Sequence, residues 1–199
     1  MQNGANVSLS PLEWELVCNP SWIYAKNNII QKVYALFGSL SNAYRSVLTQ
    51  AALPEAVLLP APKIARGEQY NGLPYVMLDY PRFFTRDDVC ALRTFFWWGH
   101  SFSVTLHLKG AYQHRYRQRI HNALSDAAFA DAWLFTGTDE WMHHVDEQHW
   151  KRVGAGKDTD LDTLPVLKIQ FSIPVQQWDD AAPFLEEKYK ALAALLQAG

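Results

Sequence analysis

The sequence predicts a single α+β domain, in which helices cover one face of a mainly antiparallel sheet of about five strands. Two segments, 100–109 and 166–173, alternate strictly between apolar and polar residues, which is typical of strands with one buried face. In 21–49, apolar residues instead recur every three or four positions, which is the period of one helix face. No Gly/Ser-rich or Pro-rich linker divides the 199 residues, so we expect 1–199 to form one domain.

The composition excludes several classes of protein. With 49% hydrophobic, 14% aromatic and 19% charged residues, the chain has enough apolar surface to fold and is not disordered. Its net charge of −2 gives no support for nucleic-acid binding, which we do not expect. No stretch approaches 18 apolar residues and no signal peptide is visible, so we expect a cytoplasmic protein with no membrane segment. The two cysteines, Cys18 and Cys90, are too few for a disulfide framework and are expected to be buried thiols.

The N-terminal part, 1–52, is expected to be helical. Ser10 is placed to cap a short helix that has Pro11 at its first position. A long helix then runs from 21 to about 49, and three prolines between 54 and 62 predict an extended crossing after it. The buried stripe of the long helix is expected to consist of Ile30, Val33, Phe37, Leu40, Tyr44 and Val47.

A hairpin and a helix are expected next. Segments 63–70 and 75–80 flank an Asn-Gly turn, which is the strongest short hairpin signal, and Pro81 is expected to end the second strand. Thr85 is followed three residues later by a carboxylate. This spacing resembles a capping box and predicts a helix over 85–99.

The second half of the chain is expected to complete the sheet. The long helix and the C-terminal helix are expected to pack on its apolar face, and a strand–helix–strand succession leaves a mixed sheet as an alternative. Segment 137–164 lacks periodicity and is expected to be an irregular excursion that is functional or mobile. The remaining elements are predicted as strand 100–109, helix 111–129, strand 132–136, strand 166–173 and helix 177–197.

Three groups of residues are candidates for binding a ligand. On the polar side of the alternating strands, His107 can act as a base and Lys168 can hold an anion, with Gln170 beside them. These groups converge if the two strands are neighbours. A second candidate is the start of helix 111–129, where free N–H groups attract anions. The residues that could assist there are Lys109 and Arg115, and the third candidate is Arg82, which lies among aromatic residues and could pair with Asp79.

A metal site is a further alternative. Glu140 and His143 are three residues apart, the spacing at which a helix presents two ligands to one metal ion, and His149 could be a third ligand. A second Glu-x-x-His motif, which a dinuclear site would need, is absent from the sequence. Polar loop histidines without a metal are the simpler interpretation, so we expect no cofactor, with a divalent transition metal as the alternative.

Two function classes stay open at this point. The sequence best fits a non-catalytic cytoplasmic domain that binds a protein partner or a small anionic ligand, because aromatic residues are in surplus and no nucleophile motif is present. The alternative is a small metal- or His-dependent enzyme in which 137–164 forms a lid over the polar sheet face. The oligomeric state does not follow from the sequence.

Overall fold

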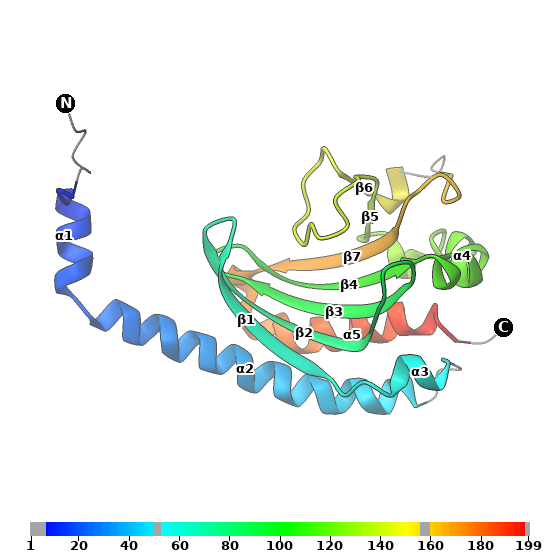
Figure 1. Cartoon of the computed structure of the whole chain (residues 1–199), viewed down its shortest axis with the longest axis horizontal. Coiled ribbons are helices and arrows are strands. Elements are labelled where there is room, and N and C mark those ends of the chain that lie inside the picture. The colour runs from blue at the N-terminus through cyan, green and yellow to red at the C-terminus, as the bar shows by residue number, and fades with distance from the viewer. Residues whose placement is uncertain (1–6, 50–52, 156–159, 198–199) are drawn as a thin grey trace.

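Seven strands form the centre of the fold. The computed structural model describes residues 7–49, 53–155 and 160–197, and within them the strands make one sheet in the order β1-β2-β3-β4-β7-β5-β6 (Figure 1). Every neighbouring pair in this order is antiparallel. The strands are β1 (Lys63–Tyr70), β2 (Leu73–Phe84), β3 (Val89–Trp97), β4 (Ser101–Lys109), β5 (Trp133–Phe135), β6 (Trp150–Arg152) and β7 (Leu167–Pro174).

Five α-helices and three short 3-10 helices accompany the sheet in the described part of the chain. Among the described residues, none of them is both long and apolar enough to cross a membrane. The α-helices are α1 (Pro11–Cys18), α2 (Ser21–Leu48), α3 (Glu55–Leu58), α4 (Ala111–Ala123) and α5 (Ala181–Ala194). The short 3-10 helices are η1 (Ala127–Phe129), η2 (Val153–Ala155) and η3 (Val175–Asp180).

The predicted α+β class with an antiparallel sheet is confirmed, but its details differ. Seven strands are present in the described part of the chain rather than about five, because β3 and β6 join the five expected ones. The mixed alternative is wrong, since no parallel pair occurs among the described strands. The layout of the helices also differs: α3 replaces part of the extended crossing, and α4 ends at Ala123 rather than 129.

The largest error is segment 85–99, which forms strand β3 and not a helix. Thr85 does bond to Asp88, as a cap would, but the two residues close the turn between β2 and β3. The backbone N–H of Thr85 donates to the carbonyl of Asp88 at 2.9 Å, and the N–H of Asp88 donates to Thr85 Oγ1 at 2.9 Å. Apolar residues occupy both buried faces of β3, with Leu92 and Phe96 on one and Phe95 and Trp97 on the other, so its sequence shows no polar–apolar alternation that would reveal a strand.

Strand β2 continues through Pro81, which was expected to end it. The register between β2 and β3 shifts between Asp79 and Arg82, and a bulge of this kind accommodates a residue that cannot donate to the ladder. The shift has a second effect. Residues three apart in a regular strand point to opposite faces, whereas Asp79 pairs with Arg93 and Arg82 with Ala91, so both side chains lie on one face.

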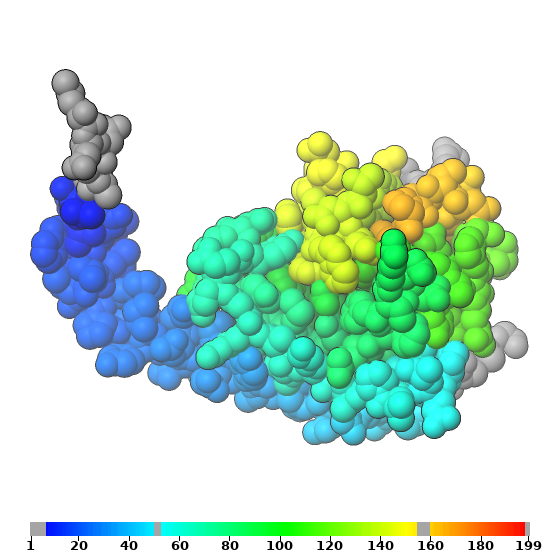
Figure 2. Space-filling model, in the orientation of Figure 1, coloured from blue at the N-terminus to red at the C-terminus, as the bar shows by residue number. Residues whose placement is uncertain are grey.

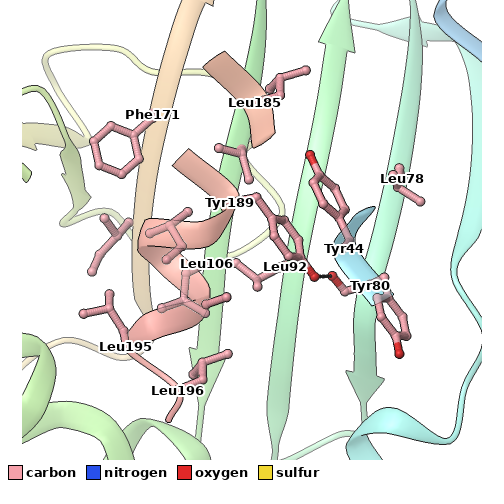
Figure 3. Packing of buried hydrophobic residues seen from close by; sticks show 14 of the residues in the cluster. Tyr44, Leu78, Tyr80, Leu92, Leu106, Phe171, Leu185, Tyr189, Leu195 and Leu196 are labelled. Carbon is pink, nitrogen blue, oxygen red and sulfur yellow. Dashed lines mark hydrogen bonds between the residues drawn. The ribbon is translucent and has the colours of Figure 1, made fainter. Parts of the chain in front are cut away.

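Helices α2 and α5 pack against the other face of the sheet, as expected, and form the main core (Figure 1). The predicted stripe of α2 is buried, except that Leu48 rather than Val47 completes it. At the centre, the rings of Tyr44 and Tyr189 stack with centroids 3.5 Å apart. Figure 3 shows the hydroxyl of Tyr189 bonded to the carbonyl of Tyr80 in β2, at 2.7 Å.

The N-terminal end of the described chain projects away from this body. The predicted short helix with Ser10 as its cap is confirmed as α1, and Figures 1 and 2 show α1 and the start of α2 extending beyond the sheet. No residue of α1 is buried. Cys18 is therefore exposed, which corrects the expectation of a buried thiol, while Cys90 is buried as expected. Residues 1–6 and 50–52 of the predicted helical part lie outside the described residues.

Replacing Tyr189 by Phe tests the central hydrogen bond. We expect Tyr189→Phe to lower the unfolding free energy by about 1–3 kcal/mol, because the buried carbonyl of Tyr80 loses its donor. Denaturant titration followed by circular dichroism measures the change. The matched control is Tyr34→Phe, which removes the same hydroxyl from a half-buried residue of α2 that has no side-chain hydrogen bond within the described residues and should change the unfolding free energy by less than about 0.5 kcal/mol.

Candidate ligand-binding site

Polar side chains from four neighbouring strands meet on the face of the sheet opposite α2 and α5, which we call the polar face. In the strand register, Asp79 of β2 faces Arg93 of β3. Arg93 in turn faces Thr105 of β4, which faces Gln170 of β7. The guanidinium of Arg93 donates to both oxygens of Asp79 at 2.7 and 2.8 Å, and Thr105 donates to Gln170 Oε1 at 3.0 Å. The row is therefore internally bonded.

The polar face is covered rather than open. His107 and Lys168 pair across β4 and β7, so their strands are neighbours, as the sequence analysis requires. However, residues 137–149, here called the cover segment, lie on these side chains and leave them 5% and 2% exposed. Figure 2 shows this part of the chain, in yellow, over the strands. His107, Lys168 and Gln170 are thus not the open ligand surface that was expected.

Lys168 attaches the cover segment to the sheet. Its Nζ donates to the backbone carbonyls of Glu140 at 2.9 Å and Met142 at 2.5 Å. The rings of Phe135 and Trp150 lie 4.8 and 5.4 Å from the same nitrogen, where they stabilise a cation. Burial, with the charge of Arg93 adding to it, lowers the pKa of Lys168 to about 7. Because Trp141 lies between the two acceptor residues, Lys168 also determines where Trp141 sits.

A buried imidazole and a carboxylate lie next to Lys168. His107 Nε2 is 3.6 Å from Glu140 Oε2, and Lys109 Nζ is 3.1 Å from Glu140 Oε1. Neither His107 Nε2 nor Glu140 Oε2 has a hydrogen-bond partner within the described residues. Burial, together with the charges of Lys168, Arg93 and Lys109, lowers the pKa of His107 to about 3, so the imidazole is neutral at pH 7.

Two further histidines attach the cover segment to β1 and β3. The backbone N–H of His143 donates to the hydroxyl of Tyr70 at 2.7 Å, and that hydroxyl lies 2.7 Å from His144 Nδ1. The imidazole of His143 lies 3.1 Å from Arg93 Nη1. Burial and then the charge of Arg93 lower the pKa of His143 to about 2, so this histidine is also neutral and acts as a packing and hydrogen-bonding group.

The three candidate metal ligands have separate partners. Glu140 lies beside His107 and Lys109, and His143 beside Arg93, whereas His149 Nδ1 lies 2.9 Å from Asp146. Within the described ranges, no three His, Cys, Asp or Glu side chains are grouped so that they could hold a metal ion. The structure therefore does not assemble the site proposed from Glu140, His143 and His149.

An open groove lies beside the cover segment, over β1, β2 and β3. Its volume is about 260 Å³. Three cationic side chains and one carboxylate reach it, and the rings of Phe84 and Trp141, with centroids 6.1 Å apart, form one wall. Trp141 is 50% exposed. We call this the basic groove; it is lined by Lys63, Ala65, Met77, Asp79, Arg82, Phe84, Arg93 and Trp141.

The cations of the basic groove differ in how far they are already paired. Arg93 is occupied by its two bonds to Asp79. Arg82 uses Nε to donate to the backbone carbonyl of Ala61 at 2.7 Å, which leaves its outer edge toward the groove without an acidic partner in the described chain. Lys63 is also without an ion pair there. The groove therefore carries an uncompensated positive charge.

The N-terminus of α4, which was proposed as an anion site, already binds a carboxylate of the protein itself. The carboxylate of Asp88 accepts a hydrogen bond from the backbone N–H of Ala111 at 2.7 Å, so it takes the position where an external anion would bind. Its two proposed assistants are also separated. Lys109 pairs with Glu140 on the polar face, whereas Arg115 lies against the ring of Tyr116, which belongs to the core on the opposite side.

The sequence identified Arg82 and Asp79 in the groove, but the expected pair between them is wrong because Arg93 binds Asp79, and the other charged neighbours were missed. Arg93 was hidden in the segment assigned to a helix, where it had no evident partner. A strand assignment would have placed it opposite Asp79. Lys63 and Trp141 carry no local signal, because only the pairing of β1 with β2 and the path of the cover segment bring them to Arg82.

Lowering the pH should destabilise the fold through His107. Its pKa is about 3 in the folded chain and 6.5 ordinarily, so below pH 6.5 the unfolded chain binds the proton and the folded chain does not. The unfolding free energy therefore falls as the pH falls, by up to about 1.4 kcal/mol per pH unit for one proton. We expect His107→Phe to reduce the slope of the unfolding free energy against pH by up to about 1.4 kcal/mol per pH unit, the value for one proton. Denaturant titration at several pH values measures this slope. An unchanged slope would contradict the assignment, and exposed His114→Phe is the control.

Comparison with known protein families, with curated proteins and with solved structures finds no match to this chain. Its function therefore has to be inferred from the chemistry of the basic groove and the covered polar face.

Proposed function

We propose that the protein binds a small anionic ligand in the basic groove. The observation that carries this proposal is the convergence of Lys63, Arg82 and Arg93 on one hollow that contains a single carboxylate, Asp79. Because Asp79 accepts hydrogen bonds from Nε and Nη2 of Arg93, Lys63 and Arg82 remain to attract an anion. A guanidinium binds a carboxylate or a phosphate with two parallel hydrogen bonds, which favours Arg82 as the main contact.

The aromatic wall indicates what the rest of the ligand looks like. Phe84 and Trp141 are among the exposed large hydrophobic residues of the chain, and exposed rings beside a charged cluster offer a stacking surface to a flat group. Trp141 is held in place from beneath by Lys168, through the carbonyls of its two neighbours. The groove is thus suited to an anion joined to an aromatic or conjugated part, such as an aromatic carboxylate.

Loss of Arg82 should weaken binding of such an anion. We expect benzoate to change the fluorescence of Trp141, and Arg82→Gln to raise its dissociation constant at least about tenfold, since a charge-assisted hydrogen bond contributes roughly 1.5–3 kcal/mol. The matched control is Arg66→Gln, which removes the same charge from β1 on the opposite face of the sheet. Equal affinity of wild type and Arg82→Gln would refute the proposal, and Trp141→Phe identifies the fluorescence signal among the 8 tryptophans.

An acid–base enzyme is the second candidate function. It is favoured by the neutral imidazole of His107, whose Nε2 lies 3.6 Å from the carboxylate of Glu140 and has no hydrogen-bond partner among the described residues. His107 does not line the groove, but its ring lies beside the aromatic wall, with its centroid 6.4 Å from that of Phe84 and 6.0 Å from that of Trp141. The cover segment would then have to move for a substrate to reach this base.

Hydrolysis of p-nitrophenyl acetate and p-nitrophenyl phosphate distinguishes the two functions. An enzyme that uses His107 should lose its hydrolysis in His107→Phe and retain it in His114→Phe. Absence of hydrolysis in the wild type, together with benzoate binding, is the result expected for a binding protein.

A further inference from the structure

The N-terminal arm, residues 7–25, exposes an unusual amount of apolar surface. It comprises α1, the connection after it and the start of α2, and it projects from the body (Figures 1 and 2). At least a third of the surface of each apolar residue in this set is exposed: Val7, Leu9, Leu12, Trp14, Leu16, Val17, Trp22, Ile23 and Tyr24.

The bend between α1 and α2 is held by specific hydrogen bonds. Ser10 and Glu13 form a complete capping box at the start of α1. At its end, the indole N–H of Trp22 donates to the carbonyl of Leu16 at 2.8 Å, and the side chain of Asn19 accepts the N–H of Ser21 at 3.1 Å. The arm is therefore a defined structure that presents its apolar residues in a fixed arrangement.

The inside of this bend is a hollow of about 490 Å³. Its lining is almost wholly apolar, with one carboxylate, and it is of a size to accept side chains from another helix. The lining residues are Leu9, Glu13, Leu16, Val17, Pro20, Trp22, Ile23 and Tyr24.

We propose that the arm of a second copy of this chain fills the hollow, so that two arms form a symmetric dimer. In a two-fold arrangement each arm contributes the same surface, and α1 of one protomer lies against α2 of its partner. The charges of the two helices agree with this pairing. α1 carries two acidic residues and no basic one, whereas α2 carries three basic residues and no acidic one. Glu13 is occupied by the capping box and Lys26 is paired with Glu68, so Glu15 of α1 and Lys32 of α2 are the charges near the arm that are available to pair between protomers.

The exposed area is also of the size that a dimer needs. With side-chain areas of about 150–250 Å² for the three aromatic residues and roughly 60–120 Å² for the aliphatic ones, the exposed fractions correspond to an apolar area on the order of 600 Å². A standard-size interface buries about 800 Å² on each partner, polar area included. Large exposed apolar patches on folded proteins mark interaction sites.

A membrane surface fits the arm less well than a second copy does. Helices that lie in a membrane interface have one apolar face and a polar face rich in Lys and Arg. In α1 the apolar residues are spread around the axis: Trp14 points away from Leu12 and Leu16, and the polar positions hold Glu13 and Glu15. Such a helix is suited to protein contacts on several sides.

The dimer is tested by sedimentation equilibrium on the full chain. We expect the wild type to have about twice the protomer mass of 22.7 kDa. The double variant Leu9→Glu, Val17→Glu places two charges in the hollow and should be a monomer with unchanged circular dichroism, because neither residue is buried in the protomer. The matched control is Leu59→Glu, which places a charge at an exposed leucine outside the arm and should remain a dimer.

A charge exchange tests how the arms pair. Glu15 and Lys32 are both exposed and have no ion pair within the described residues. Glu15→Lys should raise the dimer dissociation constant about threefold or more, and adding Lys32→Glu should restore it. Failure of this rescue would overturn the pairing of α1 with α2 of the partner. A wild type that stays monomeric, or that is monomeric and co-sediments with phosphatidylcholine vesicles, would overturn the dimer.

Discussion

Burying a polar sheet face costs free energy unless most of its polar groups find partners, and this constraint shapes the site. The cover segment meets it mainly with its backbone. Because this segment has no regular secondary structure, the carbonyls of Glu140 and Met142 are available to accept from Lys168. The same bonds place Trp141 at the groove. A lysine in the sheet interior thus positions a residue that solvent reaches.

The charged residues near the basic groove fall into two groups, those paired within the protein and those without an acidic partner in the described chain. Asp79 and Arg93 neutralise each other at close range. This pair therefore lines the groove without adding net charge to it. Arg82 and Lys63 lie farther out and keep their attraction for an anion. The bulge at Pro81 is what allows this division, because it brings Arg82 to the face that already holds Asp79. Without that extra residue, Arg82 would point into the core beneath the sheet.

The sheet with its packed helices, here called the body, encloses polar groups, whereas the N-terminal arm exposes apolar ones. In the body, polar groups are enclosed and therefore paired with one another, and a few of them, such as His107 Nε2, are left without a partner in the described chain. In the arm, apolar groups are held in a defined bend without anything of the protomer covering them. The groove and the arm lie on different parts of the molecule (Figure 1), so the proposed ligand binding and the proposed self-association use different residues.

Periodicity was sufficient to predict α2, β4, β7 and α5, because in each of these apolar residues occupy one side and more polar residues the other. α1 was found from its Ser10 cap and Pro11, and the β1–β2 hairpin from its Asn-Gly turn. Periodicity failed for β3, where apolar residues occupy both faces and the alternation disappears. Among site residues, only Arg82 and Asp79 were found in the groove from the sequence. Lys63 and Arg93 reach it through strand register, and Trp141 through the path of the cover segment.

The sequence by itself thus determined the class of fold, the amphipathic helices that form its core and the polar character of one sheet face. Only the tertiary structure decided that this face is covered and that the basic groove lies beside it. The reason is physical: periodicity records whether a side chain faces an apolar or a polar environment, but a histidine or lysine can be polar because it meets water or because it meets a carbonyl brought from a distant part of the chain. Pairing of that second kind depends on contacts such as Lys168 with Glu140, 28 residues apart, which leave no repeating pattern in the sequence.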